Sequence, residues 1–145
     1  MATSNLFKKI LVPVDNSKHA INAARIAIQI AQVHESQLIF LHVVEARAIE
    51  TMAKYGHESK EVLLAKAEES GWKILYNLEE EAVARHVHVT LILEEGAPQH
   101  VILDSAEKYQ VDLIVIGKHQ KDWAQKDAIV PSVIENAECL VLVAK

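Results

Sequence analysis

The chain has 145 residues, half of them hydrophobic, with a formal net charge of −5 and one cysteine, Cys139. This size and composition are typical of one domain with a substantial core, so we expect residues 1–145 to form a single domain. The net negative charge argues against nucleic-acid binding, and no apolar run approaches the roughly 20 residues of a membrane span. Without a signal peptide or a possible internal disulfide, the chain is expected to be cytoplasmic.

Five short apolar runs alternate with segments of helical periodicity. The runs at residues 9–15, 37–44 and 112–117 are nearly continuous in Leu, Ile and Val, which is typical of central parallel strands covered on both faces. Residues 86–93 alternate between polar and apolar and predict a half-exposed edge strand. A last apolar run, residues 139–144, ends the chain.

Helices are predicted between these runs. Asn16 or Ser17 can cap a helix over residues 18–33, and a longer helix is expected over residues 59–85. The first of these has a face of small residues that allows close approach to a sheet: Ala20, Ala24, Ala27 and Ala31. Pro98 suits the first turn of a third helix, and a last helix should lie within residues 125–136. Residues 45–58 show neither period and predict a disordered connection or a lid.

Alternating strands and helices predict a Rossmann-like α/β fold, an open five-stranded parallel sheet with helices on both faces. Ligands of such sheets gather beyond the carboxyl ends of the strands. The candidate binding residues at those ends are Pro13, Val14, Asp15, Val43 and Gly117. A structural interpretation stands beside this one, because Pro13 and Asp15 end a buried strand and Asp15 can help to cap the next helix.

The histidines raise the question of a metal site. His86 and His88 fall on one face of the predicted edge strand, where two imidazoles can share a zinc ion, but no third ligand is placed near them. We therefore predict no metal site. His42 lies in an apolar strand and is expected to satisfy a local hydrogen bond. The chain has no nucleophile with a placed base and no Walker-type motif, so we assign no catalytic residue and expect no enzyme.

Several segments taken together resemble the universal stress protein family. They are residues 10–17, 41–43, 96–106, 111–117 and 137–143, and they keep the family's order and spacing over nearly the whole chain. The resemblance implies strand order 3-2-1-4-5, cytoplasmic homodimers and a role in surviving starvation, oxidants or respiratory arrest. It also implies that Pro13, Val14, Asp15 and Val43 line the adenine and ribose end of a nucleotide pocket.

The loop after Gly117 bears on nucleotide binding. The family's ATP-binding branch carries Gly, two residues, Gly, nine residues, then Gly with Ser or Thr. Counting from Gly117 places Gln120, Val130 and Pro131 at the later positions, whereas counting back from Cys139 places Asp127 and Ala128 at the last two. Neither register restores the glycines.

Residues 117–123 instead resemble the Gly-His-His-Gln-Asp-Phe-Trp loop of the A-type branch, which does not bind ATP. We therefore expect no bound cofactor. The alternative is ATP or AMP in a residual pocket at Asp15, Val43 and Gly117, with Lys118, Lys121 and Lys126 available to attract phosphate.

Three function classes follow. The leading hypothesis is a non-enzymatic stress-response homodimer that acts through contacts with unknown protein partners. The alternative is a nucleotide-binding regulatory switch. The third, an enzyme of the wider adenine-nucleotide α-hydrolase-like superfamily, lacks that superfamily's His-rich adenylylation motif.

The dimer contact is expected at the C-terminal strand. In the implied strand order Leu140, Val141, Leu142 and Val143 form an apolar edge, which can pair antiparallel with its own copy across a two-fold axis. Trp123 is expected to anchor the preceding loop against the sheet or across a subunit contact.

Overall fold

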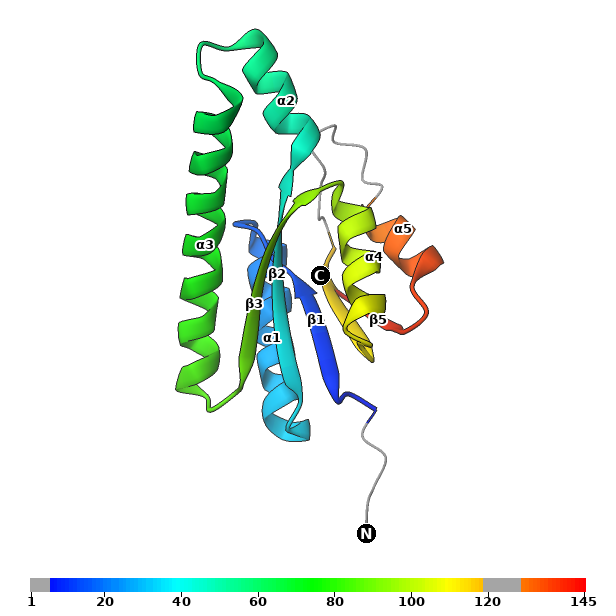
Figure 1. The fold of residues 1–145 in the computed structure, drawn as a ribbon. Coiled ribbons are helices and arrows are strands. Elements are labelled where there is room, and N and C mark those ends of the chain that lie inside the picture. The colour runs from blue at the N-terminus through cyan, green and yellow to red at the C-terminus, as the bar shows by residue number, and fades with distance from the viewer. Residues whose placement is uncertain (1–5, 119–128) are drawn as a thin grey trace.

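The structure is a computed structural model that describes residues 6–118 and 129–145. At its centre the described residues form a five-stranded parallel sheet in the order β3-β2-β1-β4-β5 (Figure 1). The strands are β1 (Lys9–Pro13), β2 (Gln37–Glu45), β3 (Val89–Gly96), β4 (Leu113–Gly117) and β5 (Leu140–Ala144). The predicted sheet, its strand order and the three central strands are confirmed.

Helices cover both faces of this sheet. One face carries α1 (Lys18–His34) and α3 (Lys60–Ala84), and the other carries α4 (Pro98–Lys108) and α5 (Ile129–Asn136). The remaining helix, α2 (Ala46–Tyr55), continues β2 beyond the sheet and contacts the upper part of α3 (Figure 1). This arrangement is the doubly wound layering that the alternating elements predict.

The core follows from the alternation of side chains along each strand. In β1, Ile10 and Val12 pack toward α1 and α3, whereas Leu11 packs toward α4 and α5. All three are completely buried, as expected for a central parallel strand. The predicted small face of α1 is buried from Ala20 to Ala31, so the helix backbone lies close to the sheet.

Three helices end in the same kind of turn. Glu35, His86 and Gln110 follow α1, α3 and α4 with φ values of 55°, 61° and 53°. At each, the next amide bonds back to a carbonyl five residues earlier; the Ser36 nitrogen, for example, is 3.1 Å from the Ala31 oxygen. This left-handed ending turns the chain sharply from helix to strand, usually with glycine. Here side-chain-bearing residues accept the conformation.

Two sequence predictions are wrong at this level. Residues 46–55 are helix α2, not a disordered connection; the helix begins directly after β2 with no capping side-chain bond and buries only Ile49. Its start signal is therefore weak, but Ile49, Met52 and Ala53 have the spacing of one helical face, a pattern that does predict a helix. The edge strand begins at Val89 instead of residue 86, because His86 belongs to the turn that closes α3.

None of the helices within the described ranges is both long and apolar enough to cross a membrane.

The left-handed turns give a stability test. Glu35→Gly should raise the free energy of unfolding by up to about 1 kcal/mol, because glycine adopts positive φ without the cost of about 1–2 kcal/mol that other residues carry. The matched control Gln32→Gly, in the last turn of α1, should lower it by about 1 kcal/mol. Urea unfolding followed by circular dichroism measures both. An equal decrease in the free energy of unfolding in both variants would contradict the left-handed conformation of Glu35.

Candidate functional site

The switch point of the sheet contains a cavity of about 160 Å³. The chain runs from β1 through β2 to β3 on one side and returns to β4 on the other, so the cavity lies where parallel sheets usually bind ligands. Its lining is Pro13, Val14, Asp15, Leu41, Val43, Glu45, Pro98, Ile102 and Ile129. The structure thus brings together four of the five residues predicted from the sequence.

Unequal strand lengths create this cavity. The register of β1 with β2 ends at the pair Pro13 and Leu41, while β2 continues to Glu45. On β2, the backbone groups of odd-numbered residues face β1; for example, the Leu41 oxygen accepts a hydrogen bond of 2.8 Å from the Val14 nitrogen. Even-numbered residues face β3, since the Leu38 nitrogen donates to the His88 oxygen just before that strand. By this alternation the N–H and C=O of Val43 face the space beyond the end of β1.

Pro13 closes the other side of β1. Odd-numbered residues of this strand face β4, since the Lys9 oxygen accepts from the Asp112 nitrogen at 2.9 Å. Pro13 has no N–H to offer there, and the register with β4 ends two residues earlier, at Leu11 and Ile114. The two ladders of β1 therefore stop at the cavity.

Helix N-termini surround the same space. Asp15 precedes α1, Glu45 precedes α2, Pro98 opens α4 and Ile129 opens α5. The unpaired N–H groups of helix starts favour negative charge or oxygen acceptors, and the carboxylates of Asp15 and Glu45 already supply negative charge beside two of them. The sequence did not indicate Glu45 and Ile129 as site residues; Glu45 was missed because helix α2 was not predicted, whereas α5 lies within the predicted range of residues 125–136.

The side chain of Asp15 has a local structural role. Its Oδ1 accepts a hydrogen bond of 2.7 Å from the Ser17 nitrogen, and the Ser17 hydroxyl caps α1 by accepting from the Ala20 nitrogen at 3.2 Å. The structural interpretation of Asp15 is therefore correct in part: Ser17 is the cap, and Asp15 holds the turn before it. The same turn fixes the Asp15 carboxylate at the rim of the cavity.

Gly117 is explained by packing. A Cβ at this position would lie 2.6 Å from the His19 carbonyl carbon and 2.9 Å from the Ala20 nitrogen. The end of β4 thus touches the backbone of the first turn of α1, which only glycine permits. Gly117 does not line the cavity described above, and residues 119–128, which include Gln120 and Trp123, lie outside the described ranges.

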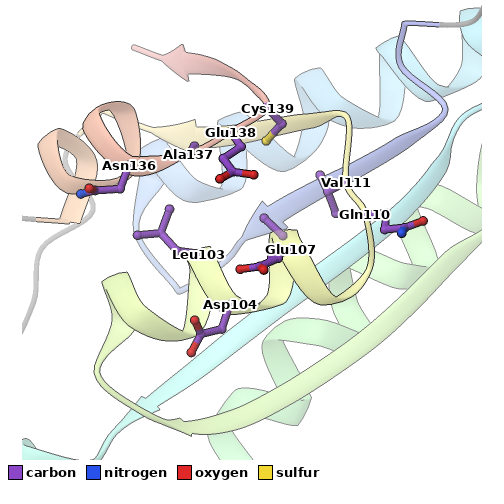
Figure 2. A pocket seen from close by; sticks show the side chains of 10 residues that line it. Leu103, Asp104, Glu107, Gln110, Val111, Asn136, Ala137, Glu138 and Cys139 are labelled. Atoms are coloured by element: carbon purple, nitrogen blue, oxygen red, sulfur yellow. The ribbon is translucent and has the colours of Figure 1, made fainter.

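A larger cavity, about 450 Å³, lies at the opposite end of the sheet between α4, the end of α5 and the start of β5 (Figure 2). Three carboxylates line it, Asp104, Glu107 and Glu138, so it disfavours anionic ligands. Cys139 lies at its edge and is half-buried; this partial burial raises the pKa of the thiol and favours its neutral, unreactive form.

The histidine pair does not form the predicted strand face. His86 is a left-handed turn residue and His88 precedes β3. In the parts of the chain that the structure describes, no group of three or more His, Cys, Asp or Glu residues is arranged to hold a metal ion.

These features define a Rossmann-like α/β domain with a ligand cavity at the switch point of its sheet. The model of the universal stress protein family matches residues 6–145. The chain belongs to the universal stress protein family.

Individual relatives agree with this assignment. Universal stress protein MJ0531 of Methanocaldococcus jannaschii is 32% identical over 144 residues, which cover 97% of this chain and 84% of the relative. The solved structure of MJ0577 from the same organism is 27% identical, with a TM-score of 0.76 and coverage of 97% of this chain and 96% of that one. A family member from Arabidopsis thaliana, solved with AMP bound, has a TM-score of 0.68 at 17% identity, covering 95% and 91% of the two chains, and shares the fold.

A substitution at Gly117 tests whether this glycine is required by its contact with α1 or by ligand binding. Gly117→Ala should lower the free energy of unfolding by about 1–3 kcal/mol in the absence of any ligand, because the added methyl meets backbone atoms that cannot move aside. The exposed neighbour provides the control, since Lys118→Ala should change stability by no more than about 0.5 kcal/mol. Thermal and urea unfolding of the ligand-free protein measure both. A Gly117→Ala variant as stable as the wild type would contradict the close contact with α1.

Proposed function

We propose that this universal stress protein is a non-catalytic cytoplasmic regulator that forms homodimers through β5 and acts through contacts with other proteins, without binding nucleic acid. We propose further that its switch-point cavity accepts the nucleoside end of an adenine nucleotide and holds a triphosphate weakly. The observation that carries the second part is the position of Val43, whose backbone donor and acceptor face the cavity.

The chemistry of the lining suits a nucleoside. A purine presents a donor and an acceptor side by side on its edge, which a strand residue such as Val43 can match with its own N–H and C=O. Ile102 and Ile129 are apolar, and the carboxylates of Asp15 and Glu45 suit the hydroxyl donors of a ribose. The relative solved with AMP shares this fold, which supports an adenine nucleotide as the ligand class.

The same lining disfavours a triphosphate. Asp15 and Glu45 place negative charge at the rim, and Pro131 removes one N–H from the first turn of α5, where a phosphate would otherwise find donors. The cavity of about 160 Å³ is also smaller than the roughly 300–1,000 Å³ of pockets that enclose a whole drug-sized ligand. The described residues therefore hold part of a nucleotide.

Titration calorimetry tests the nucleotide preference. AMP should bind at least as tightly as Mg-ATP, whose dissociation constant should lie well above the low micromolar range. Asp15→Asn provides the matched variant: its Oδ1 can still accept from Ser17, while the lost charge should tighten Mg-ATP binding more than AMP binding. Low micromolar binding of Mg-ATP, or ATP carried through purification, would refute this preference.

The dimer proposal rests on the exposed edge of β5. Leu140, Leu142 and Val143 are 54%, 38% and 36% exposed, and on its other side β5 pairs with β4. An apolar strand edge of this kind can pair with its own copy across a two-fold axis. No like-charge repulsion between two copies of β5 opposes this pairing, because residues 140–144 carry no ionisable side chain.

The backbone register distinguishes two proline variants of β5. The Leu140 and Lys118 nitrogens bond to Asp112 and Ala144 oxygens, so even-numbered residues of β5 face β4 and odd-numbered residues face outward. Val141→Pro therefore removes an outward N–H and should give a folded monomer, whereas Leu142→Pro breaks the ladder with β4 and should destabilise the monomer itself. Light scattering and thermal unfolding measure the two effects. A wild type that is monomeric at micromolar concentration would refute the dimer.

A further inference from the structure

His42 links α3 to the end of β1. The residue lies in β2 and its side chain points toward α3, since its neighbours on that face, Phe40 and Leu38, belong to the core formed with α1 and α3. Its Nδ1 lies 2.8 Å from the carbonyl oxygen of Val14. A carbonyl only accepts, so Nδ1 carries the proton and donates, which confirms the predicted local hydrogen bond of His42.

Gly71 fixes the imidazole from the other side. A Cβ at Gly71 would lie 2.5 Å from Cδ2 of His42 and 2.8 Å from a methyl group of Leu93. Gly71 is buried in the middle of α3, where glycine costs about 1 kcal/mol relative to alanine in helix stability. The helix therefore approaches the sheet closely enough that the ring is held between α3 and the Val14 carbonyl.

The hydrogen bond from His42 to Val14 lies where the next hydrogen bond of the ladder between β1 and β2 would form. If the parallel pairing continued by one more step, the Val43 N–H would donate to the Val14 carbonyl. Within the described residues the Val14 nitrogen bonds to Leu41, but no hydrogen bond joins Val43 nitrogen to Val14 oxygen. The His42 ring bonds to that oxygen instead. Since a carbonyl oxygen can accept two hydrogen bonds, the ring excludes Val43 by directing the carbonyl toward its own Nδ1, out of line with the Val43 N–H.

We propose that His42 is a positioning residue of the pocket: by holding the Val14 carbonyl it stops the ladder one step early and leaves the Val43 N–H facing the cavity. Gly71 is the position on α3 that makes room for the ring. This inference rests on the proposed nucleoside pocket for its functional meaning, although its structural content concerns the ligand-free protein.

Amide hydrogen exchange of the ligand-free protein tests the structural content. In His42→Phe the ring volume remains but the donor is lost, so the Val14 carbonyl can turn toward the Val43 amide, which should exchange more slowly, by about tenfold or more. A merely structural role for His42 predicts the opposite, because a loosened strand end exchanges faster. In His42→Asn the amide nitrogen takes the place of Nδ1, so the Val43 amide should exchange as in the wild type.

Calorimetric titration with AMP tests the functional meaning. His42→Phe should bind AMP about five- to tenfold more weakly, the effect of one net hydrogen bond, and His42→Asn should restore most of the affinity. Gly71→Ala should weaken AMP binding through displacement of the ring, whereas the exposed neighbour in the same helix turn, Ser70→Ala, should have no effect. In a His42→Ala background Gly71→Ala should cause no further loss.

The two measurements separate the two proposals. If the Val43 amide of His42→Phe exchanges as fast as in the wild type or faster, the role of His42 is refuted, whatever AMP does. If wild-type protein fails to bind AMP while the Val43 amide of His42→Phe gains protection, the role of His42 stands and the nucleoside pocket is refuted.

Discussion

The end of β1 at Pro13 is the constraint on which the rest of the site depends. A central parallel strand normally bonds to both neighbours along its length, but proline has no N–H for β4, and the ladder on that side stops at Leu11. On the other side β2 continues four residues past its last partner, from Leu41 to Glu45. A cavity lined by backbone polar groups follows directly, because the N–H and C=O groups of β2 that face β1 have no partner strand beyond Leu41.

Close contacts at two glycines hold helices α1 and α3 against the sheet beside this cavity. Gly117 brings the end of β4 against the first turn of α1, and Gly71 brings α3 against His42. Both contacts exclude a Cβ, so neither glycine owes its place to conformational freedom. Interiors are packed too densely for such contacts to shift gradually, and the geometry at Val14 and Asp15 is therefore set by two helices at once.

Much of the fold could be predicted because its causes are local in sequence. Continuous apolar runs identify central strands, and the small residues of α1 identify a helix that lies close to the sheet. Helix α2 was harder to recognise, because its start has no capping side chain and its apolar residues, Ile49, Met52 and Ala53, extend over little more than one turn. His86 was predicted in the edge strand but lies in the turn after α3, because its side chain gives no sign of a left-handed conformation that glycine usually adopts.

The residues of the candidate site could be predicted where they follow from the ends of strands, but not where they depend on contacts between residues far apart in the sequence. Pro13, Val14, Asp15 and Val43 follow from the rule that ligands bind at the carboxyl ends of strands. The availability of the Val43 N–H in the proposed pocket, however, depends on a hydrogen bond between His42 and Val14, 28 residues apart, and on which of two donors the Val14 carbonyl points toward. No periodicity or motif encodes that competition.

Electrostatics at the cavity set a limit on the charge of its ligand. Each helix N-terminus stabilises a nearby negative charge by roughly 0.3–1 kcal/mol at an exposed site, and the cavity is bordered by the starts of α1, α2, α4 and α5 within the described chain. Asp15 and Glu45 offset much of this, because two carboxylates already lie beside two of those starts. The remaining attraction of the helix N-termini for negative charge favours one phosphate over three. Each further phosphate gains less stabilisation from the helices and is repelled by the same two carboxylates. We therefore expect the proposed pocket to discriminate between nucleotides by their charge as well as by the adenine edge that Val43 would bind.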